Sequence, residues 1–199
     1  MRTPKEHLSH TQINLWETSR DRYIRHYFHG EEFPSTVYMD LGKQVAEALD
    51  NGESDDEIIS LLISTFPAYP KREVELRATL KDKKEKINLL AIIDGLDIKK
   101  GILGEYKTGK KWTQKQADKS PQLLFYHLVY FLKTGKMLKK VYLHWAETEW
   151  RDDILTFTGS IQTFEVVHTR LDLLKMQMKV KRVYKEISET WEKELATIK

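Results

Sequence analysis

The sequence predicts an α/β protein in which helices flank a mixed central β-sheet and a helical unit precedes it. Two observations carry this prediction. The first seventy residues hold helix-start signals and amphipathic segments, whereas short apolar runs typical of strands alternate with helical segments after residue 70. We expect a single domain over 1–199, divided into a helical unit (1–70), the sheet with a core helix (71–160) and a C-terminal helix (161–199).

The composition excludes several classes of protein. Of the 199 residues, 40% are hydrophobic and 32% are charged, which is typical of a folded globular chain. The chain has no cysteine, which excludes disulfides, thiolate zinc sites, cysteine nucleophiles and cysteine-bound iron–sulfur clusters. No apolar signal core and no run of 18 apolar residues occurs, so we expect a cytoplasmic protein that does not enter a membrane.

The N-terminal unit opens on a helix-start signal. Ser9 is placed to cap a helix, Gln12 to return the hydrogen bond, and Leu8 to pack on Ile13, so we expect a helix from here to about Phe28. Two further helices are expected, one over Tyr38 to Leu49, ended by Asn51-Gly52, and one opened by a capping box at Ser54 to Glu57 and ended by Pro67 and Pro70.

The pattern changes to strands after residue 70. Apolar spacing predicts a strand over 73–80, and two apolar runs predict strands from Lys86 to Ile98 and from Gly101 to Lys107. The short connection at Lys99-Lys100 makes the last two strands a hairpin. The remaining expected elements are a buried helix from Ser120 to Lys133, strands from Lys140 to Thr148 and Ile154 to Thr158, and a mostly helical segment from Thr163 to Lys199.

This hairpin brings two acids together. Asp94 and Glu105 lie equally far from the centre of the Lys99-Lys100 connection, so they oppose each other with side chains on one face of the sheet. Two carboxylates that close repel each other unless a cation lies between them. Oxygen ligands at an open site suit Mg²⁺ or Mn²⁺. We therefore expect both acids to bind metal, with the backbone carbonyl of Tyr106 as a third ligand.

Lys107 lies two residues after Glu105 and therefore on the same face of its strand. A lysine beside a metal holds or activates the attacking water and offsets phosphate charge in the transition state. The alternative is a surface ion network of little energetic value. The helix that follows adds Gln122 and Tyr126, two polar groups one turn apart on an otherwise apolar element, unless they mark a helix edge in contact with solvent.

Together these residues resemble a known family. Asp94, Glu105-x-Lys107 and Gln122-x-x-x-Tyr126, carried by the phrases IIDGLD, GEYKTGK and QLLFY, resemble the RecB-like branch of the PD-(D/E)XK nuclease superfamily. The stretch LSHTQINLWETSRDRYIRHYF resembles the opening helix of those nucleases, which often reads LSxSxIxxYxxCPxKY. The likeness covers the chain from Leu8 to about the last helix. It implies a restriction-endonuclease-like core and a metal-dependent DNA nuclease, with Asp94 and Glu105 as metal ligands, Lys107 as catalytic lysine, and Gln122 and Tyr126 completing the site.

The chain departs from this pattern in two places. In many relatives the helix after the opening unit reads GxxVHE, and its histidine contributes to the metal site, but here Ala46 stands at that place. Glu47 or Gln44 is the available substitute, since other branches use a helical glutamate; the alternative is that Glu47 simply faces solvent. Ser19-Arg20 replaces the usual Cys-Pro, so no iron–sulfur cluster is expected.

The leading hypothesis is a Mg²⁺- or Mn²⁺-dependent deoxyribonuclease, an exonuclease of DNA recombination, repair or phage and mobile-element DNA processing. The net charge is only +3, so DNA contact is assigned to a local cluster. There Lys110, Lys111 and Lys115 follow the backbone, and Trp112 either stacks on a base or serves as a packing lid.

The second hypothesis is a nuclease-fold module that binds DNA or protein without cutting. The chain has no GxxxxGK[ST] phosphate loop, so any ATP-driven step in a repair or recombination assembly would come from protein partners. The sequence leaves the oligomeric state and the choice between exonuclease and endonuclease open.

Overall fold

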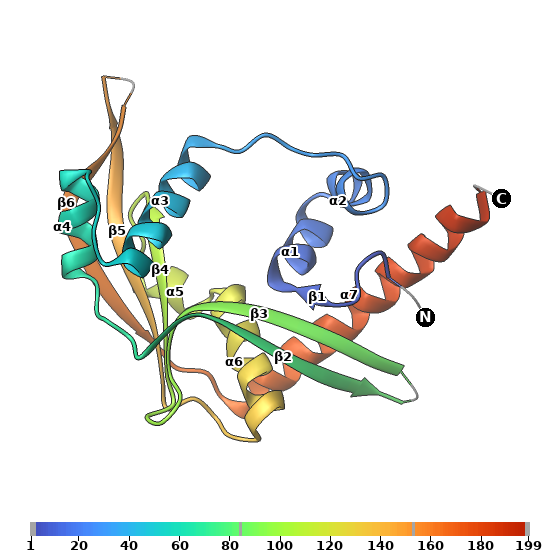
Figure 1. The fold of residues 1–199 in the computed structure, drawn as a ribbon. Helices are drawn as coiled ribbons and strands as arrows, with labels where there is room; N and C mark the ends of the chain where they lie inside the picture. Colours follow the sequence, from blue (N-terminus) through green and yellow to red (C-terminus); the bar gives the residue numbers. More distant parts are fainter. Residues whose placement is uncertain (1–2, 84, 153, 198–199) are drawn as a thin grey trace.

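A mixed β-sheet between two layers of helices forms the centre of the molecule (Figure 1). The computed structural model describes residues 3–83, 85–152 and 154–197, and within them the sheet has six strands in the order β1-β3-β4-β5-β6, with β2 also paired to β3. Strands β1 and β3 are parallel, as are β4 and β5, and the other pairs are antiparallel. The strands are β1 (Leu8–Ser9), β2 (Lys71–Asp82), β3 (Glu85–Asp97), β4 (Ile102–Gly109), β5 (Lys140–Arg151) and β6 (Ile154–Val166).

The helices divide between the two sides of the sheet. Helix α6 packs against β2 and β3 and also against α1 and α7, whereas α3 contacts β4 and α4 contacts β6. The helices are α1 (His10–Thr18), α2 (Arg20–Tyr27), α3 (Val37–Asn51), α4 (Glu57–Thr65), α5 (Gln114–Asp118), α6 (Pro121–Thr134) and α7 (Arg170–Thr197). The mixed sheet flanked by helices that the sequence predicts is therefore confirmed.

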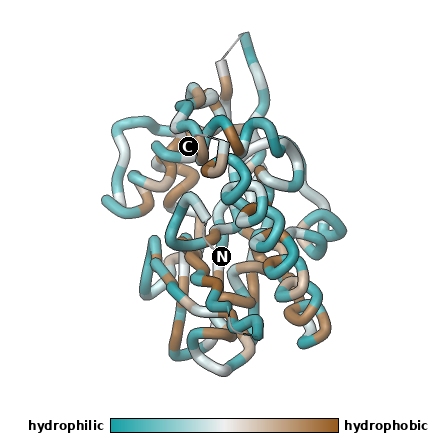
Figure 2. Tube along the Cα trace, turned by 90° about the vertical axis from the view of Figure 1, so that its right-hand side faces the viewer, coloured by the Kyte–Doolittle hydropathy of each residue, from teal (hydrophilic) through white to brown (hydrophobic). Residues whose placement is uncertain are grey.

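The buried apolar side chains of the described residues form two clusters. The larger lies among β2–β5, α1, α6 and α7, and the smaller joins α3 and α4 to β4–β6 through residues such as Leu49, Leu62 and Ala146. Figure 2 shows apolar and hydrophilic stretches in alternation along the chain, as expected where most elements bury one face. Among the helices in the described part of the chain, none combines the length and apolar character that a membrane span requires.

The β3–β4 hairpin has the predicted register. Gly95 pairs with Gly104 and Leu96 with Leu103, so continuing the same register places Asp94 opposite Glu105. The connecting turn is closed by a hydrogen bond of 2.8 Å from the Gly101 N–H to the Asp97 carbonyl. Strand pairing therefore delivers the two acids to adjacent positions.

The single helix expected up to Phe28 is wrong, because the chain breaks at Ser19. This residue has φ −159° and ψ 84°, and separates α1 from α2. In a continuous helix, residues seven apart are separated by about 10 Å along the axis. The break instead lets the rings of Trp16 and Tyr23 pack edge to face with centroids 5.1 Å apart, and both side chains are buried.

The boundary of the C-terminal helix is also wrong. Residues 163–166 belong to β6, where Phe164 and Val166 are buried and Glu165 between them is not, and α7 begins only at Arg170. Pairing with β5 extends the strand beyond the predicted end at Thr158. The last two residues of the predicted helix, 198–199, lie outside the described part.

Smaller differences concern helix caps and short elements. The backbone N–H of Ile59 is capped by Asp56 rather than Ser54, at 3.0 Å. Strand β1 and helix α5 were not predicted, although Thr113 and Gln116 form a capping box at the start of α5. A two-residue strand and a helix of five residues are too short to produce a periodic pattern.

Candidate active site

The acidic pair lies where the β3–β4 ladder ends. Beyond the Gly95–Gly104 pair, the Asp94 carboxylate accepts a hydrogen bond of 2.8 Å from the backbone N–H of Tyr106. Glu105, one residue earlier, is 2% exposed. The Asp94 side chain thus takes a backbone donor of β4 and is held against the strand that carries Glu105.

Glu105 is the centre of a hydrogen-bonded group from β4 and α6. Its Oε1 lies 2.6 Å from the Lys107 Nζ and accepts a hydrogen bond of 2.7 Å from the Gln122 side chain. The Gln122 amide also donates to the Tyr126 hydroxyl at 2.8 Å. Ser120 caps α6 by accepting from the Leu123 N–H, which starts the helix next to β4. Asp94, Glu105, Lys107, Gln122 and Tyr126 are therefore brought together.

Burial and mutual repulsion set the charges of these groups. Burial, followed by the charge of Asp94, raises the pKa of Glu105 to about 8 despite the nearby Lys107. Burial also raises the pKa of Asp94, although the Tyr106 N–H and Lys107 oppose this. Burial would lower the pKa of Lys107, but the attraction of Glu105 outweighs it and the pKa is raised. The site thus holds two crowded acids beside a charged lysine.

The two acids fit a small divalent cation. The buried Glu105 Oε2 accepts no hydrogen bond from any described group. A carboxylate oxygen without a donor, next to a second carboxylate, is the environment that a Mg²⁺ or Mn²⁺ ion relieves. Among the described residues, no group of three or more acidic, histidine or cysteine side chains is arranged to hold a metal ion. The remaining positions around such an ion would fall to backbone, water or substrate oxygens, as is usual for Mg²⁺.

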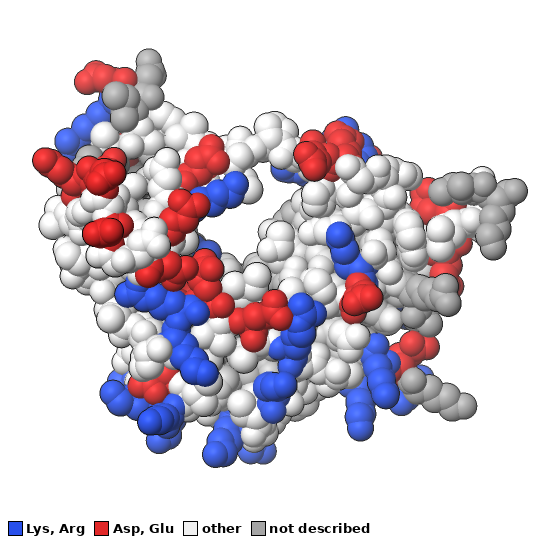
Figure 3. All heavy atoms as spheres, in the orientation of Figure 1, with Lys and Arg blue, Asp and Glu red and all other residues white. Residues whose placement is uncertain are grey.

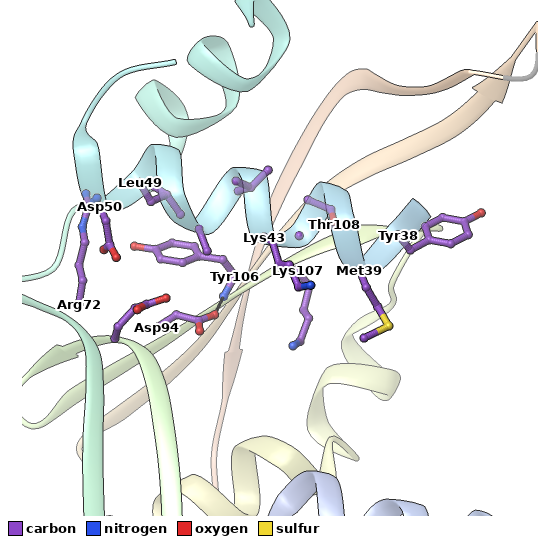
Figure 4. A pocket seen from close by; sticks show the side chains of 14 residues that line it. Tyr38, Met39, Lys43, Leu49, Asp50, Arg72, Asp94, Tyr106, Lys107 and Thr108 are labelled. Carbon is purple, nitrogen blue, oxygen red and sulfur yellow. Dashed lines mark hydrogen bonds between the residues drawn. The ribbon is translucent and has the colours of Figure 1, made fainter. Parts of the chain in front are cut away.

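A cleft of about 430 Å³ opens between α3 and the strands that carry the acids. Figure 4 shows Asp50 and Arg72 at one end of it and Tyr38 at the other. Lys43 of α3 and Lys107 of β4 lie between these ends. Lys43, Asp50 and Arg72 were not predicted as site residues, because only tertiary packing brings them to the cleft that holds Asp94.

The substitutes for the missing helix histidine do not reach this cleft. Ala46 lines it together with Asp94, at the place where the histidine of the resembling nucleases would stand. Glu47 and Gln44 line a separate hollow with residues of the α3–α4 connection. Helix geometry explains this, because positions 44 and 47 are turned roughly 160° and 100° from position 46 around an axis with 3.6 residues per turn. Glu47 therefore lies outside the cleft that holds Asp94.

Glu73 is a further acid at this cleft, and it was not predicted as a site residue. Its neighbours Arg72 and Val74 pair with Gly95 and Ile93, so the register places Glu73 across from Asp94. It lines the same cleft and has a φ of 44°, in the left-handed region that a glutamate rarely adopts. The sequence predicted a strand over 73–80 but not the register in which it pairs with β3, and this register is what places Glu73 across from Asp94.

The proposed DNA-contacting residues follow directly after β4. Lys110, Lys111 and Lys115 are exposed, the last on α5. Trp112 is half-buried and packs against the larger apolar cluster, which matches the packing-lid alternative. The three lysines remain free to meet a polyanion on the surface beside the site.

An aromatic residue from outside the hairpin supports the acidic pair. The Tyr69 ring lies over Gly95 and Gly104, so close that a Cβ added at Gly104 would be 2.3 Å from the ring. The Tyr69 hydroxyl is hydrogen-bonded to the His144 Nε2 at 2.7 Å, and the other His144 ring nitrogen to Thr163 at 2.9 Å. The glycine pair next to Asp94 and Glu105 is thus covered by a ring that is tied to β5 and β6.

Solved structures share this arrangement of elements. The crystal structure of LHK-Exo in complex with dAMP has a TM-score of 0.55 to this chain at 15% identity, over 98% of this chain and 96% of that one. The chain therefore shares its fold with LHK-Exo. A second structure, of the alkaline exonuclease LHK-Exo from Laribacter hongkongensis, has a TM-score of 0.53 at 13% identity, over 98% and 95% of the two chains. The shared fold with LHK-Exo extends from the N-terminal helical unit to α7. No protein-family model and no curated protein sequence matches the chain.

Proposed function

We propose that this protein is a Mg²⁺- or Mn²⁺-dependent deoxyribonuclease that hydrolyses DNA from an end. The observation that carries the proposal is the buried Glu105, which meets Asp94, Lys107 and Gln122 while its Oε2 accepts no hydrogen bond from the described residues. A structural ion pair has no need for a second buried acid, because the added repulsion costs folding free energy. Strongly perturbed acids beside a cleft are instead typical of catalytic sites.

Each residue of the group has a distinct task in this proposal. Asp94, Glu105 and the Tyr106 carbonyl would hold the ion, which when bound supplies an activated water and neutralises phosphate charge. Lys107 orients the attacking water and offsets charge on the phosphate. Gln122 and Tyr126 hold Glu105 in place by the chain of hydrogen bonds from α6.

The structural similarity to LHK-Exo supports the assignment of an exonuclease activity. One of the two structures of that enzyme contains dAMP, a deoxynucleoside monophosphate. Exposed Lys110, Lys111 and Lys115 would contact the DNA backbone. We further assign the chain to the RecB-like branch on the motifs at its first helix and site, with a role in DNA repair, recombination or mobile-element processing alongside protein partners.

The test is degradation of linear DNA by the purified protein with Mg²⁺ or Mn²⁺. Asp94→Asn and Lys107→Ala are each expected to slow cleavage by at least about 100-fold, because each removes charge stabilisation at the reacting phosphate. The matched controls are Glu189→Gln on α7 and Lys136→Ala after α6, both exposed and remote from the cleft. Full activity in both site variants would contradict the assignment. DNA binding without cleavage by the wild-type protein would favour the non-cutting module instead.

A further inference from the structure

Lysines are concentrated on two segments where β4 and β5 begin. These are the β3–β4 connection, residues 97–101, and the end of α6 with the connection to β5, residues 133–140. Together they hold six lysines and one acid, a net charge of +5 on 13 residues of a chain whose total is +3, so the rest of the chain carries −2. Figure 3 shows Lys and Arg side chains along the lower margin of the molecule, where both connections lie in Figure 1. The six lysines are exposed, and we call them the lysine patch: Lys99, Lys100, Lys133, Lys136, Lys139 and Lys140.

Backbone hydrogen bonds join the two segments. The N–H groups of Lys139 and Lys140 both donate to the Gly101 carbonyl, at 2.8 and 3.3 Å. Gly101 has a φ of 68°, in the left-handed region that glycine adopts without strain, and its own N–H donates to the Asp97 carbonyl. The lysines of the two segments therefore lie side by side, although they are far apart in the sequence.

Each segment is also fixed internally. The Asp97 carboxylate, which is largely buried, accepts a hydrogen bond of 2.9 Å from the Lys100 N–H and lies 3.8 Å from the Lys100 ammonium. In the α6–β5 connection, the Leu138 N–H donates to Nε2 of the buried His127 at 2.9 Å. A surface with a fixed backbone loses little conformational entropy when a ligand binds to it.

Acids neutralise only part of the patch. Glu165 pairs with Lys140 at 3.2 Å. Within the described part of the chain, no acid pairs with Lys99, Lys136 or Lys139. These three ammonium groups are therefore available to an external anion, and none of them has to break an ion pair first.

The composition of the patch favours DNA over an acidic protein surface. The two segments contain no arginine and no aromatic residue, which are enriched in protein–protein interfaces, whereas lysine is depleted there. Ile98 is exposed here, but an isolated apolar side chain is usual on a protein surface. Lysines are point charges on flexible stems, and they suit a phosphate backbone, which is bound by charge without regard to sequence.

The patch and the candidate active site lie along the same strand. Lys107 is six residues after Gly101, and a strand advances about 3.3 Å per residue, so about 20 Å separate them along β4. About six base pairs of a duplex span this distance, at about 3.4 Å each. Lys110 and Lys111 follow the other end of β4, so the acids lie between two basic surfaces.

We propose that the lysine patch binds the phosphate backbone of the DNA substrate about 20 Å from the reacting bond. The inference rests on the proposed nuclease function and adds a second contact surface for the same substrate. Such a surface takes no part in the chemistry, but it holds a long DNA close to the cleft and so raises the affinity. A DNA too short to reach both surfaces gains nothing from it.

The first experiment measures DNA binding in the absence of cleavage. Asp94→Asn protein is titrated into a fluorescent DNA of 30 nucleotides, single-stranded or paired with its complement, at several salt concentrations. The patch variant carries Lys99→Gln, Lys136→Gln and Lys139→Gln in addition. We expect it to bind at least about 10-fold more weakly and the slope of log K against log salt to be smaller by about 2, because each lost phosphate contact removes about 0.7–0.9 from that slope.

The matched control removes the same charge elsewhere. It carries Lys81→Gln, Lys83→Gln and Lys86→Gln at the far end of the β2–β3 hairpin, where all three side chains are exposed. Its affinity for DNA should stay within about 2-fold of the parent, and circular dichroism melting checks that both variants are folded. An unchanged affinity and salt slope in the patch variant would overturn the proposal, as would an equal loss in the control. Patch-dependent binding of poly-glutamate without patch-dependent binding of DNA would overturn it in favour of an acidic protein.

The second experiment varies the length of the DNA. The parent and the patch variant are compared on single strands and duplexes lengthened stepwise from 4 to 30 nucleotides. Both proteins should bind the shortest DNA alike, and only the parent should gain affinity once the DNA reaches the patch. A constant ratio of the two affinities at every length would overturn a separate, distant surface.

Cleavage is measured separately with wild-type protein and Mn²⁺. Absence of cleavage on every DNA, together with patch-dependent binding, would count against the nuclease function and leave the contact surface in place. Cleavage of linear DNA without patch-dependent binding would keep the nuclease function and overturn the contact surface. The two proposals therefore fail in different measurements.

Discussion

At the scale of the residue, the surroundings of Glu105 combine several features that disfavour an ionised carboxylate. Its carboxyl is buried, faces a second acid and has one oxygen that accepts no hydrogen bond from the described groups. Lys107 and Gln122 both contact the other oxygen. The folded chain therefore maintains an arrangement that is unfavourable for an ionised acid and favourable for a bound cation.

Because the pKa of Glu105 is raised in the folded chain, the free energy of unfolding depends on pH over a defined range. An ordinary glutamate ionises near 4.5, whereas Glu105 in the folded chain has a pKa of about 8. Between these values the folded state keeps a proton that the unfolded state has released, so the free energy of unfolding falls as pH rises from 4.5 to 8. Above 8 this contribution no longer changes.

Glu105→Gln removes this titration. Between pH 5 and pH 8.5 the wild type loses about 4 kcal/mol of this contribution, because one pH unit corresponds to about 1.4 kcal/mol. Without divalent metal, the Tm of the variant minus that of the wild type is therefore expected to grow by roughly 8–15 °C over this range, since 1 kcal/mol corresponds to about 2–4 °C at this chain length. Thermal melts at several pH values measure it, with Glu189→Gln as a control whose difference should stay constant. A constant difference for Glu105→Gln as well would contradict the raised pKa.

At the scale of the element, the β3–β4 hairpin depends on a ring from outside it. Tyr69 precedes β2 and covers Gly95 and Gly104, the last paired residues before the acids. Any side chain at these two positions would meet the ring, so glycine here serves close packing rather than backbone freedom. The distance between the strands at the site is therefore tied to Tyr69.

Gly104→Ala is expected to destabilise the protein by about 1–3 kcal/mol, because its methyl group would overlap the Tyr69 ring. In the double variant Tyr69→Ala/Gly104→Ala the two costs should not add, since the clash is gone. Urea denaturation measures both. The control is Gly42→Ala in α3, where an added Cβ meets nothing within 4 Å and a gain of about 0.5–1 kcal/mol is expected. Simple additivity in the double variant would show that the ring and the glycine are not coupled.

At the scale of the whole molecule, the two apolar clusters differ in size. The larger one unites α1, α6 and α7 with the sheet, whereas α3 and α4 are held on the sheet by the smaller one. Elements with fewer buried apolar contacts open at a lower free energy. The α3 side of the cleft should therefore be the less stable wall.

Hydrogen exchange measured by mass spectrometry tests this difference. Amides of α3 and α4 should exchange faster than those of β3 and α6. Leu62→Ala, in the smaller cluster, should speed exchange in α3 and α4 while α6 stays protected. Leu128→Ala, in the larger cluster, is the comparison and should speed exchange throughout. Equal protection of both parts in the wild-type protein would contradict a weaker α3 side.

Local sequence by itself determined much of the fold and the core of the candidate site. Hydrophobic periodicity and turn residues placed most of the long elements, because these signals act over a few neighbouring residues. The short Lys99-Lys100 connection settled the hairpin register and hence the approach of Asp94 to Glu105. The i, i+4 spacing of Gln122 and Tyr126 likewise placed them on one face of α6.

Only the tertiary structure decided what surrounds that core. The break at Ser19 follows from ring packing between Trp16 and Tyr23, and residues 163–166 join β6 because β5 lies beside them. The orientation of α3 brings Ala46, rather than Glu47, to the cleft. Residues 28–36 join α2 to α3 across an opening between the two sides of the molecule (Figure 3). Contacts of this kind depend on how separate elements pack, and local sequence patterns do not contain that information.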